Sequence, residues 1–459
     1  MKLANGQISL SATDLSNHLS CTHLTQLNRR HAYKELVRPE RKNRFLDRII
    51  ERGLIHEEAY IDHLKTDASR NVVEFEYKEP NVEEKTLEAM KDGVGIIAQG
   101  ALSNACWSGR PDLLIKIPTP SPAFGDWSYE VADTKLTKTT KASTILQLCV
   151  YSEMIAEIQN IAPENMYVVM PDDVDDSPFQ VETHRYDDYA AYFRIARKNL
   201  VQDANRVIDT YPEPVSHCDI CQWWTDCDKR RREDDHLTFV AGIQKAQIVE
   251  FKKQGITTLT GLATADSPLK LPIEGDSNDS IQRIHQQAQI QYMGAQSKRP
   301  EFDFLDVVHP TEKDNQLRGF LKLPAPERAD LFFDIESARH APGGGLEYLL
   351  GYVHGDADKP EFDHLWGLNR QDEKTAFKAF IDLAIQRLDT SRGMHIYHFA
   401  PYEPVAMKRL ATRHATREAE LDHLLRQQVF VDLYSVTRQA IRASVESYSS
   451  RHWRGWPAV

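Results

Sequence analysis

The stretch that decides the fold of the first half of this chain is residues 127–135, which read Trp-Ser-Tyr-Glu-Val-Ala-Asp-Thr-Lys. Its aromatic and β-branched residues predict a strand, and the two-residue period of a strand places Asp133 and Lys135 on one face of a sheet. A carboxylate there can ligate Mg²⁺, and an adjacent ammonium can activate a water or offset charge on a phosphate. Alone, the acid-x-Lys pattern is weak, because any amphipathic strand edge can carry it.

Three short polar motifs accompany this strand: one on a helix before it, one in a turn before the neighbouring strand, and one on the helix after it. In chain order they are Gly53-Leu-Ile-His56-Glu57, Gly109-Arg-Pro-Asp112 and Gln147-Leu-Cys-Val-Tyr151. Pairing of strands predicted at 112–117 and 127–133 would bring the Asp112 and Asp133 carboxylates together. Gln147 and Tyr151 are four residues apart on a helix predicted at 145–158, so they share one face.

Four cysteines lie on either side of these motifs. Cys21 precedes them, and Cys218, Cys221 and Cys227 follow with the spacing C-x2-C-x5-C. In a reducing compartment, a tight cysteine cluster is more typical of a metal site than of a disulfide framework. Zinc and iron–sulfur clusters both accept four thiolates, so the spacing alone leaves the metal open.

The ordered set G-x-x-H-E, G-R-P-D, D-T-K and Q-x-x-x-Y resembles the RecB-like branch of the PD-(D/E)xK nucleases. The resemblance implies an α/β fold with a restriction-endonuclease-like core, and metal-dependent hydrolysis of DNA. The ligands that it implies for Mg²⁺ or Mn²⁺ are His56, Asp112 and Asp133. It gives Lys135 the role of the catalytic lysine beside the two aspartates, and it places Gln147 and Tyr151 against the substrate.

The flanking cysteines are similar to those of the iron–sulfur members of that branch, which include AddB-type and CRISPR-associated nucleases. This resemblance implies a [4Fe–4S] cluster bound by Cys21, Cys218, Cys221 and Cys227. A zinc site with the same four ligands is the alternative. The remaining cysteines, Cys106 and Cys149, are expected to be small buried hydrophobic residues.

A second α/β pattern begins with residues 331–336, which read Leu-Phe-Phe-Asp-Ile-Glu. Asp334 and Glu336 are two residues apart on this predicted strand, so their carboxylates share a face. The elements expected here are strands at 331–336, 347–353 and 360–366, a helix at 373–388, a strand at 395–399 and a helix from 403. Three strands, a helix, a strand and a helix is the opening order of a ribonuclease-H-like sheet.

This second pattern resembles the two-metal DEDD exonucleases of the ribonuclease-H-like fold, as found after RecB-like nucleases in some large nuclease–helicase proteins. The site residues that the resemblance implies are Asp334, Glu336, Glu403 and Asp432. Glu403 stands where an aspartate is commoner, and no helix with a last aspartate is expected after Ser449. We therefore expect this site to be inactive, its domain to be incomplete, and the chain to be a truncated form.

The chain has 459 residues, too many for one ordinary core. We expect a nuclease domain at 1–235, a helical connector at 236–325 and a partial ribonuclease-H-like domain at 326–459. The net charge of −12 argues against a general polyanion binder but leaves local basic clusters possible. No apolar run is long enough to span a membrane, and the polar start lacks a signal-peptide core, which predicts a cytoplasmic protein.

Together these features predict a cytoplasmic, iron–sulfur, metal-dependent exonuclease that acts on single-stranded or frayed DNA ends in repair or processing, with a helicase as a possible partner. A second hypothesis is a non-catalytic nucleic-acid-binding or scaffold protein, a remnant of a truncated nuclease–helicase. The two differ in one outcome: the second would bind DNA without metal-dependent cleavage.

Overall fold

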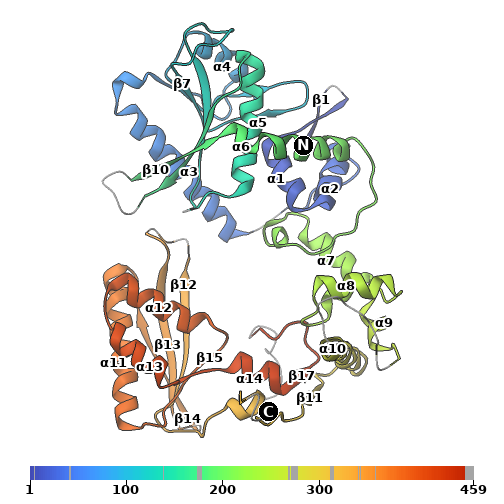
Figure 1. The fold of residues 1–459 in the computed structure, drawn as a ribbon, viewed down its shortest axis with the longest axis vertical. Helices are drawn as coiled ribbons and strands as arrows, with labels where there is room; N and C mark the ends of the chain where they lie inside the picture. Colours follow the sequence, from blue (N-terminus) through green and yellow to red (C-terminus); the bar gives the residue numbers. More distant parts are fainter. Residues whose placement is uncertain are drawn as a thin grey trace. The chain divides into compact units, whose positions relative to one another are not determined.

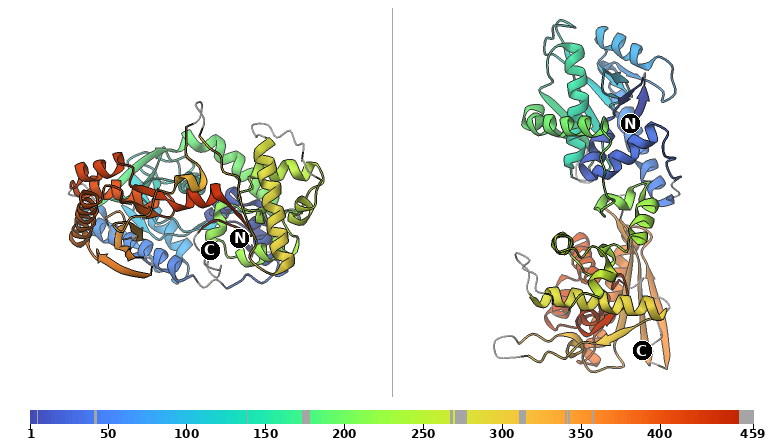
Figure 2. Two further views of the ribbon diagram at one scale, coloured as in Figure 1. Left: turned by 90° about the horizontal axis from the view of Figure 1, so that it is seen from below. Right: turned by 90° about the vertical axis from the view of Figure 1, so that its right-hand side faces the viewer.

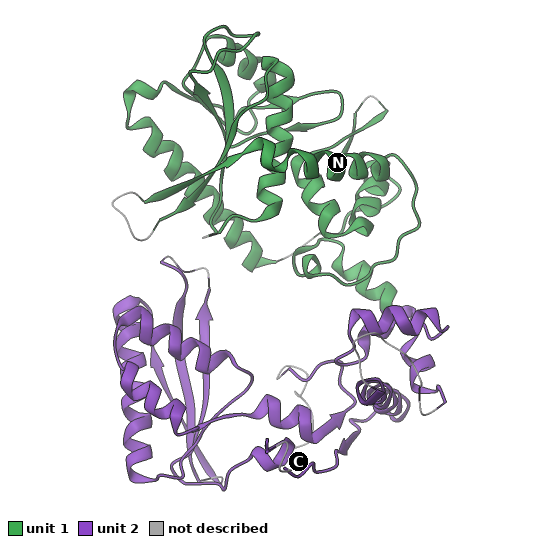
Figure 3. Ribbon diagram, viewed as in Figure 1, with its two compact units in different colours: residues 1–231 green, residues 232–459 purple. Residues whose placement is uncertain are grey.

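The computed structural model describes residues 1–4, 6–40, 43–137, 139–172, 178–266, 269, 278–310, 315–339, 341, 343–356 and 358–449. The chain divides into two compact units, 1–231 and 232–459 (Figure 3). Each unit has a sheet and a hydrophobic core of its own. Among the described helices, none is long and apolar enough to cross a membrane.

The first unit is built on a six-stranded mixed sheet with the order β10-β9-β8-β7-β4-β3. The strands are β3 (Val72–Glu74), β4 (Ile96–Ala98), β7 (Leu113–Ile117), β8 (Ser128–Thr134), β9 (Asn165–Pro171) and β10 (Phe179–Arg185). β8 is buried along its whole length, antiparallel to β7 and parallel to β9. The strands predicted around 112–117 and 127–133 are therefore present.

Helices cover this sheet and form the N-terminal part of the unit (Figures 1 and 2). They are α1 (Ala12–Ser20), α2 (Thr22–Ala32), α3 (Arg44–Lys65), α4 (Val82–Lys91), α5 (Ala142–Gln159), α6 (Tyr186–Ala204) and α7 (Trp224–Glu233). α1 begins with a capping box in which Ser11 and Asp14 bond each other's backbone N–H groups. α5 packs directly on β8, which places its polar residues near the sheet's central strand.

Residues 96–103 of the first unit form two short strands that are separated by a break. The segment 95–102 forms β4 and then a separate two-residue strand, β5 (Leu102–Ser103), which pairs with β6 (Ser108–Gly109). The break occurs at Gln99, whose backbone is left-handed with φ of 55°. Extended pairing cannot continue through that conformation, so the chain turns toward the carboxylates described below.

The second unit contains a five-stranded sheet with the order β14-β13-β12-β15-β16. Its strands are β12 (Leu331–Ala338), β13 (Leu346–Asp356), β14 (Lys359–Trp366), β15 (Ile396–His398) and β16 (Phe430–Asp432). The first three are antiparallel, whereas β12, β15 and β16 run parallel. This is the strand arrangement expected of a ribonuclease-H-like sheet.

Helices pack on one face of this sheet (Figure 1). They are α11 (Arg370–Thr390), α12 (Tyr402–His414) and α13 (Glu418–Arg426), followed by α14 (Leu433–Ala440). Phe333 of β12 stacks on Phe380 of α11 with ring centroids 3.9 Å apart. Alternate residues of β12 are buried, so Asp334 and Glu336 lie on the face opposite that core.

The segment expected to be a helical connector is part of the second unit. It forms α8 (Lys245–Lys253), α9 (Leu259–Ala263), α10 (Asn278–Ser297), β11 (Phe302–Phe304) and short 3₁₀ turns. β11 pairs with β17 (Ile441–Ala443), and Gln287 of α10 donates to the Ala443 carbonyl at 2.9 Å. Residues 270–277 and the segment 450–459, where the last aspartate was not expected, lie outside the described residues.

Candidate functional site

Asp112, Asp133 and Lys135 meet at one end of β7 and β8. Asp112 immediately precedes β7, and its Oδ2 accepts hydrogen bonds from the Thr134 N–H at 2.7 Å and the Thr134 hydroxyl at 2.9 Å. Asp133 is the second-last residue of β8, and its carboxylate forms an ion pair with the Lys135 ammonium. The strand pairing therefore brings together the three side chains that the sequence placed in one site.

Lys135 is held just beyond the end of β8, where its N–H donates to the Val169 carbonyl at 2.8 Å. Burial would lower the pKa of its ammonium, but the charges of Asp133, Asp112 and Glu57 outweigh burial and raise it. These charges favour the protonated form of Lys135, which can attract a phosphate or orient a water.

Glu57 of α3 joins this group, although the sequence analysis assigned it no role. Burial and then the charge of Asp112 raise its pKa to about 7, while Gln99 donates a side-chain hydrogen bond to its carboxylate. Burial and the charge of Asp112 likewise raise the pKa of Asp133 to about 7. Carboxylates that repel one another in a desolvated place are typical of a functional site that binds a cation.

His56, the expected metal ligand on the same helix, lies differently. Its Nε2 is 3.4 Å from the Val169 carbonyl, and its ring is 5.6 Å from that of Phe179. Burial lowers its pKa. His56 thus approaches the carbonyl that also accepts the Lys135 N–H, whereas Glu57 is the α3 side chain affected by the carboxylate charges. His56 and Glu57 lie about 100° apart around α3, and the sequence does not say which of the two directions faces the aspartates, which explains why Glu57 was missed.

Tyr151 and Gly109 form one side of the site. The Tyr151 ring lies so close to the backbone that a Cβ at position 109 would be 2.8 Å from its Cε1, so only glycine is accommodated. Burial, followed by the charges of Asp133 and Asp112, raises the Tyr151 pKa. Gln147 is half-buried one turn earlier on α5. Tyr151 therefore lies beside the aspartates, where a substrate contact was expected.

Arg110, next to Gly109, has a structural role. Its guanidinium donates to the carbonyl oxygens of Gln99 at 3.1 Å and Tyr77 at 2.9 Å. These bonds join the loop after β3 to the break after β4. Arg110 thereby fixes the turn that carries Asp112, and its donors face the backbone.

The four cysteines expected to act together line one small cavity of about 20 Å³. Cys21 lies between α1 and α2, Cys218 in a 3₁₀ turn, and Cys227 in the first turns of α7. Burial raises the pKa of Cys21, and burial with the charge of Cys221 raises that of Cys227 to about 12. Thiolates are therefore disfavoured here unless a cation compensates them.

The segments that carry these cysteines are also joined by ordinary hydrogen bonds. Trp223 is buried and donates its indole N–H to the Asn28 side chain at 3.1 Å. Gln26 donates to the Asp203 carbonyl at 2.8 Å. Protein contacts therefore also join the two ends of the first unit.

Two different donor sets could hold metal in the first unit. As they stand, no three His, Cys, Asp or Glu side chains among the described residues are arranged as the ligands of one metal ion. Mg²⁺ commonly uses only one or two carboxylates together with waters and substrate phosphates, so Asp112 and Asp133 suit it. The four thiols suit a soft metal by their chemistry and their shared cavity.

In the second unit, Asp334 lies close enough to Glu403 for its charge to affect that carboxyl group. Asp334 is exposed on the open face of β12, and Glu403 is buried in the first turn of α12. Burial raises the pKa of Glu403, and the charge of Asp334 raises it further. His398, whose Nδ1 is 3.5 Å from the Glu403 carboxylate, lowers this pKa but does not outweigh the other two effects. Glu336 is exposed two residues after Asp334 on the same face.

The Asp432 carboxylate accepts hydrogen bonds from two backbone N–H groups. Its Oδ1 accepts the N–H of Ala400 at 2.9 Å and that of Tyr434 at 3.0 Å, so it caps α14. Ala400 has φ of 73°, and its carbonyl lies 2.6 Å from the His398 Nδ1. Asp432 thus fixes the turn before Glu403 at the same sheet edge, the end of the parallel strands β15 and β16.

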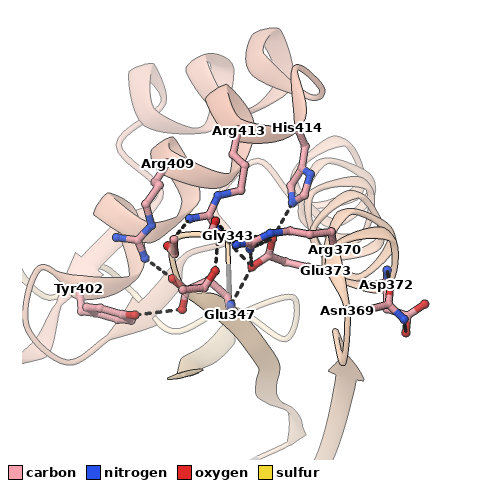
Figure 4. A network of polar contacts seen from close by, with 12 residues as sticks. Gly343, Glu347, Asn369, Arg370, Asp372, Glu373, Tyr402, Arg409, Arg413 and His414 are labelled. Atoms are coloured by element: carbon pink, nitrogen blue, oxygen red, sulfur yellow. Dashed lines mark hydrogen bonds and ion pairs between the residues drawn. The ribbon is translucent and has the colours of Figure 1, made fainter. Parts of the chain in front are cut away.

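A separate network surrounds two buried carboxylates near the start of β13 and α11 (Figure 4). Glu373 accepts the Glu347 N–H at 2.7 Å and contacts Arg370, Arg413 and His414. Although burial alone would raise its pKa, the Glu347 N–H and the two arginines lower it. The negative charge of Glu373 is thus balanced by its neighbours, and the network stabilises the start of β13.

The Glu347 carboxylate extends the same network toward the second site. It accepts the Tyr402 hydroxyl at 2.9 Å and forms an ion pair with Arg409. Tyr402 precedes Glu403 in α12, so Glu347 positions the start of the helix that carries this acid. None of these roles was visible in the sequence.

Comparison with protein families gives one match. A family model described as the RNase_H superfamily matches residues 331–451. Together with the strand order, this match shows a ribonuclease-H-like domain in the second unit, and it supports a nuclease type of hydrolase. No curated protein matches the chain.

Proposed function

We propose that this protein is a metal-dependent nuclease that hydrolyses phosphodiester bonds of DNA, at single-stranded or frayed ends, with its reactive centre in the first unit. The observation that carries the proposal is the convergence of Glu57, Asp112 and Asp133 on Lys135, with two carboxyl pKa values near 7. Three acids and one cation leave an excess of negative charge that a divalent cation would relieve.

Asp112 and Asp133 would hold Mg²⁺ or Mn²⁺, which supplies charge stabilisation and an activated water. His56 remains a candidate ligand, through rotation away from the Val169 carbonyl. Lys135 would offset charge on the phosphate, since its raised pKa keeps it protonated. Tyr151 would limit the approach of the strand to the aspartates, and Gln147 would contact it from the same helix face.

The cysteine cavity supports a structural metal centre, for which we propose a [4Fe–4S] cluster held by Cys21, Cys218, Cys221 and Cys227. Anaerobically purified protein should be brown and contain iron and sulfide. A colourless protein with stoichiometric zinc would instead identify a Cys₄ zinc site. A role in DNA repair or processing, beside a helicase partner, belongs to the same proposal.

The test is cleavage of end-labelled single-stranded and duplex DNA by the full chain with Mg²⁺ or Mn²⁺. Asp112→Ala and Lys135→Ala should abolish cleavage, whereas Glu58→Ala, an exposed neighbour of Glu57 on α3, should not. If wild-type protein cleaves nothing but binds DNA, the non-catalytic alternative replaces this proposal.

A second hydrolytic centre at Asp334, Glu336, Glu403 and Asp432 is favoured by the family match and by the effect of Asp334 on Glu403. Residual metal-dependent cleavage in Asp112→Ala that disappears in a double variant with Asp334→Ala would assign it activity. Identical residual cleavage in both proteins would leave the second unit without a catalytic role.

A further inference from the structure

A groove of about 630 Å³ lies within the second unit, between α10 and the segment from α14 to β17. This volume is in the range of sites that hold a substantial ligand. The charged side chains lining it are three arginines, Arg283, Arg438 and Arg442, and one acid, Asp432. In a chain whose net charge is −12, this is a local reversal of sign.

The arginines of the groove are not neutralised by carboxylates. Arg283 donates to the Asp279 carbonyl at 3.2 Å, and Arg438 lies 3.4 Å from the Tyr434 hydroxyl. Arg442 stands opposite Asp303 in the β11–β17 pair. Within the described part of the chain, none of the three forms an ion pair with a carboxylate.

Other arginines of the same unit show that such pairing is readily available. Arg328 pairs with Asp356 at 2.6 Å and Arg417 with Asp382 at 2.6 Å, both near the surface. In contrast, burial lowers the pKa of Arg442, although the charges of Tyr448 and Asp303 oppose this effect; Arg283 adds slightly to it. Neighbouring arginines whose guanidinium groups form no ion pair within the described residues favour an anionic ligand.

The groove leads to the candidate site of the second unit. Asp432 and Pro401 form part of its wall, and Pro401 directly precedes the helix that carries Glu403. Uncharged donors complete the lining, among them Gln244, Gln439 and Ser435. We propose that this groove binds the sugar–phosphate backbone of a single nucleic-acid strand and leads it toward the carboxylates at the ends of β15 and β16.

The inference rests on the proposed function for the identity of its ligand, but it concerns binding in the other unit. The test uses the full chain, a fluorescent oligothymidylate about 20 nucleotides long, and EDTA to prevent cleavage. Fluorescence anisotropy gives Kd across a salt series. Each phosphate contact contributes about 0.7 to the slope of log K against log salt for a single strand, so Arg283→Gln/Arg438→Gln should reduce the slope by about 1.4.

Arg328→Gln is the matched control, because Arg328 is exposed in the same unit and has its own partner, Asp356. It should leave the slope unchanged. Arg442 is half-buried on β17, so Arg442→Gln is paired with Arg442→Lys, which keeps the charge and should restore most of the binding. Thermal unfolding of every variant shows whether its fold is intact.

An unchanged slope in the folded double variant would overturn the inference. So would equal displacement of the oligonucleotide from wild type and double variant by polyglutamate, since the groove would then not be the polyanion site. Polyglutamate binding with no oligonucleotide binding would identify an acidic protein as the partner and also reject it. Binding that depends on the arginines in a protein without cleavage would instead reject only the nuclease proposal.

Discussion

The half-buried and buried carboxylates beside β8 and the buried ones at the starts of β13 and α11 are balanced in opposite ways. In the first group, Glu57, Asp112 and Asp133 share one cation, and two of their pKa values rise to about 7. In the second, Glu347 and Glu373 face three arginines, and the pKa of Glu373 falls. Carboxylates that outnumber the nearby cations favour binding of a metal ion, whereas carboxylates that are outnumbered by arginines form a stabilising structural network.

Substitution of Asp133 should give the largest effect and so tests the difference between the two groups most directly. Asp133→Asn should reduce metal-dependent DNA cleavage by about 10³-fold, because it removes a ligand and the partner of Lys135. At neutral pH without metal the same variant should raise the Tm, since a repelled buried charge is lost. Asp126→Asn, an exposed change just before β8, should alter neither quantity. A less active but destabilised Asp133→Asn protein would mean that the acids are structural.

Glu373→Gln should have the opposite effect. Replacing the acid leaves Arg370 and Arg413 without their buried partner, at a cost of about 3 kcal/mol to the second unit. For a unit of this size, the Tm should fall by about 10 °C. DNA cleavage by the first unit should stay within about twofold of wild type. Glu418→Gln, an exposed change on α13, is the control, and equal Tm values would refute the structural role.

Gly109→Ala tests the packing around the aspartates. The new Cβ would overlap the Tyr151 ring, which should cost about 1–3 kcal/mol and displace Tyr151 from the site. Both the Tm and the cleavage rate should therefore fall. Gly53→Ala on α3 meets only Leu136 at 4.0 Å and should be neutral or slightly stabilising. Equal behaviour of the two variants would mean that Tyr151 moves aside freely.

The pH dependence of stability should differ in sign between the two groups. Asp133 and Glu57 bind protons more tightly in the folded state, so metal-free β8 should lose about 3 kcal/mol for each group as pH rises from about 4 to 7. Glu373 has a lowered folded pKa, so its contribution is present above its unfolded value and is lost as pH falls below about 4.

Hydrogen exchange in peptides of β8 and α11, corrected for intrinsic rates, separates these two effects. Excess Mg²⁺ should abolish the loss in β8 at neutral pH and leave α11 unchanged. Parallel pH profiles for the two peptides would show that the charge balance of the carboxylates does not govern local stability.

The sequence predicted the features that depend on spacing along one element. The two-residue period put Asp334 and Glu336 on one strand face, and strand pairing brought Asp112 to Asp133. The sequence could not decide whether His56 or Glu57 faces the aspartates, because it does not show how α3 is rotated against the sheet. Nor could it find Arg283 beside Arg442, which come together only through tertiary packing and carry no local motif.

The hydrogen bond between Trp223 and Asn28 joins residues 195 positions apart. During synthesis, α1 leaves the ribosome early and can pack on α5 once residues 142–159 have emerged, because these two helices are in contact. α2 packs on α6 and bonds Trp223, so its docking is completed last. Completion of the first unit is therefore timed by the emergence of residues 203–227, the same segment that brings three of the cysteines to Cys21.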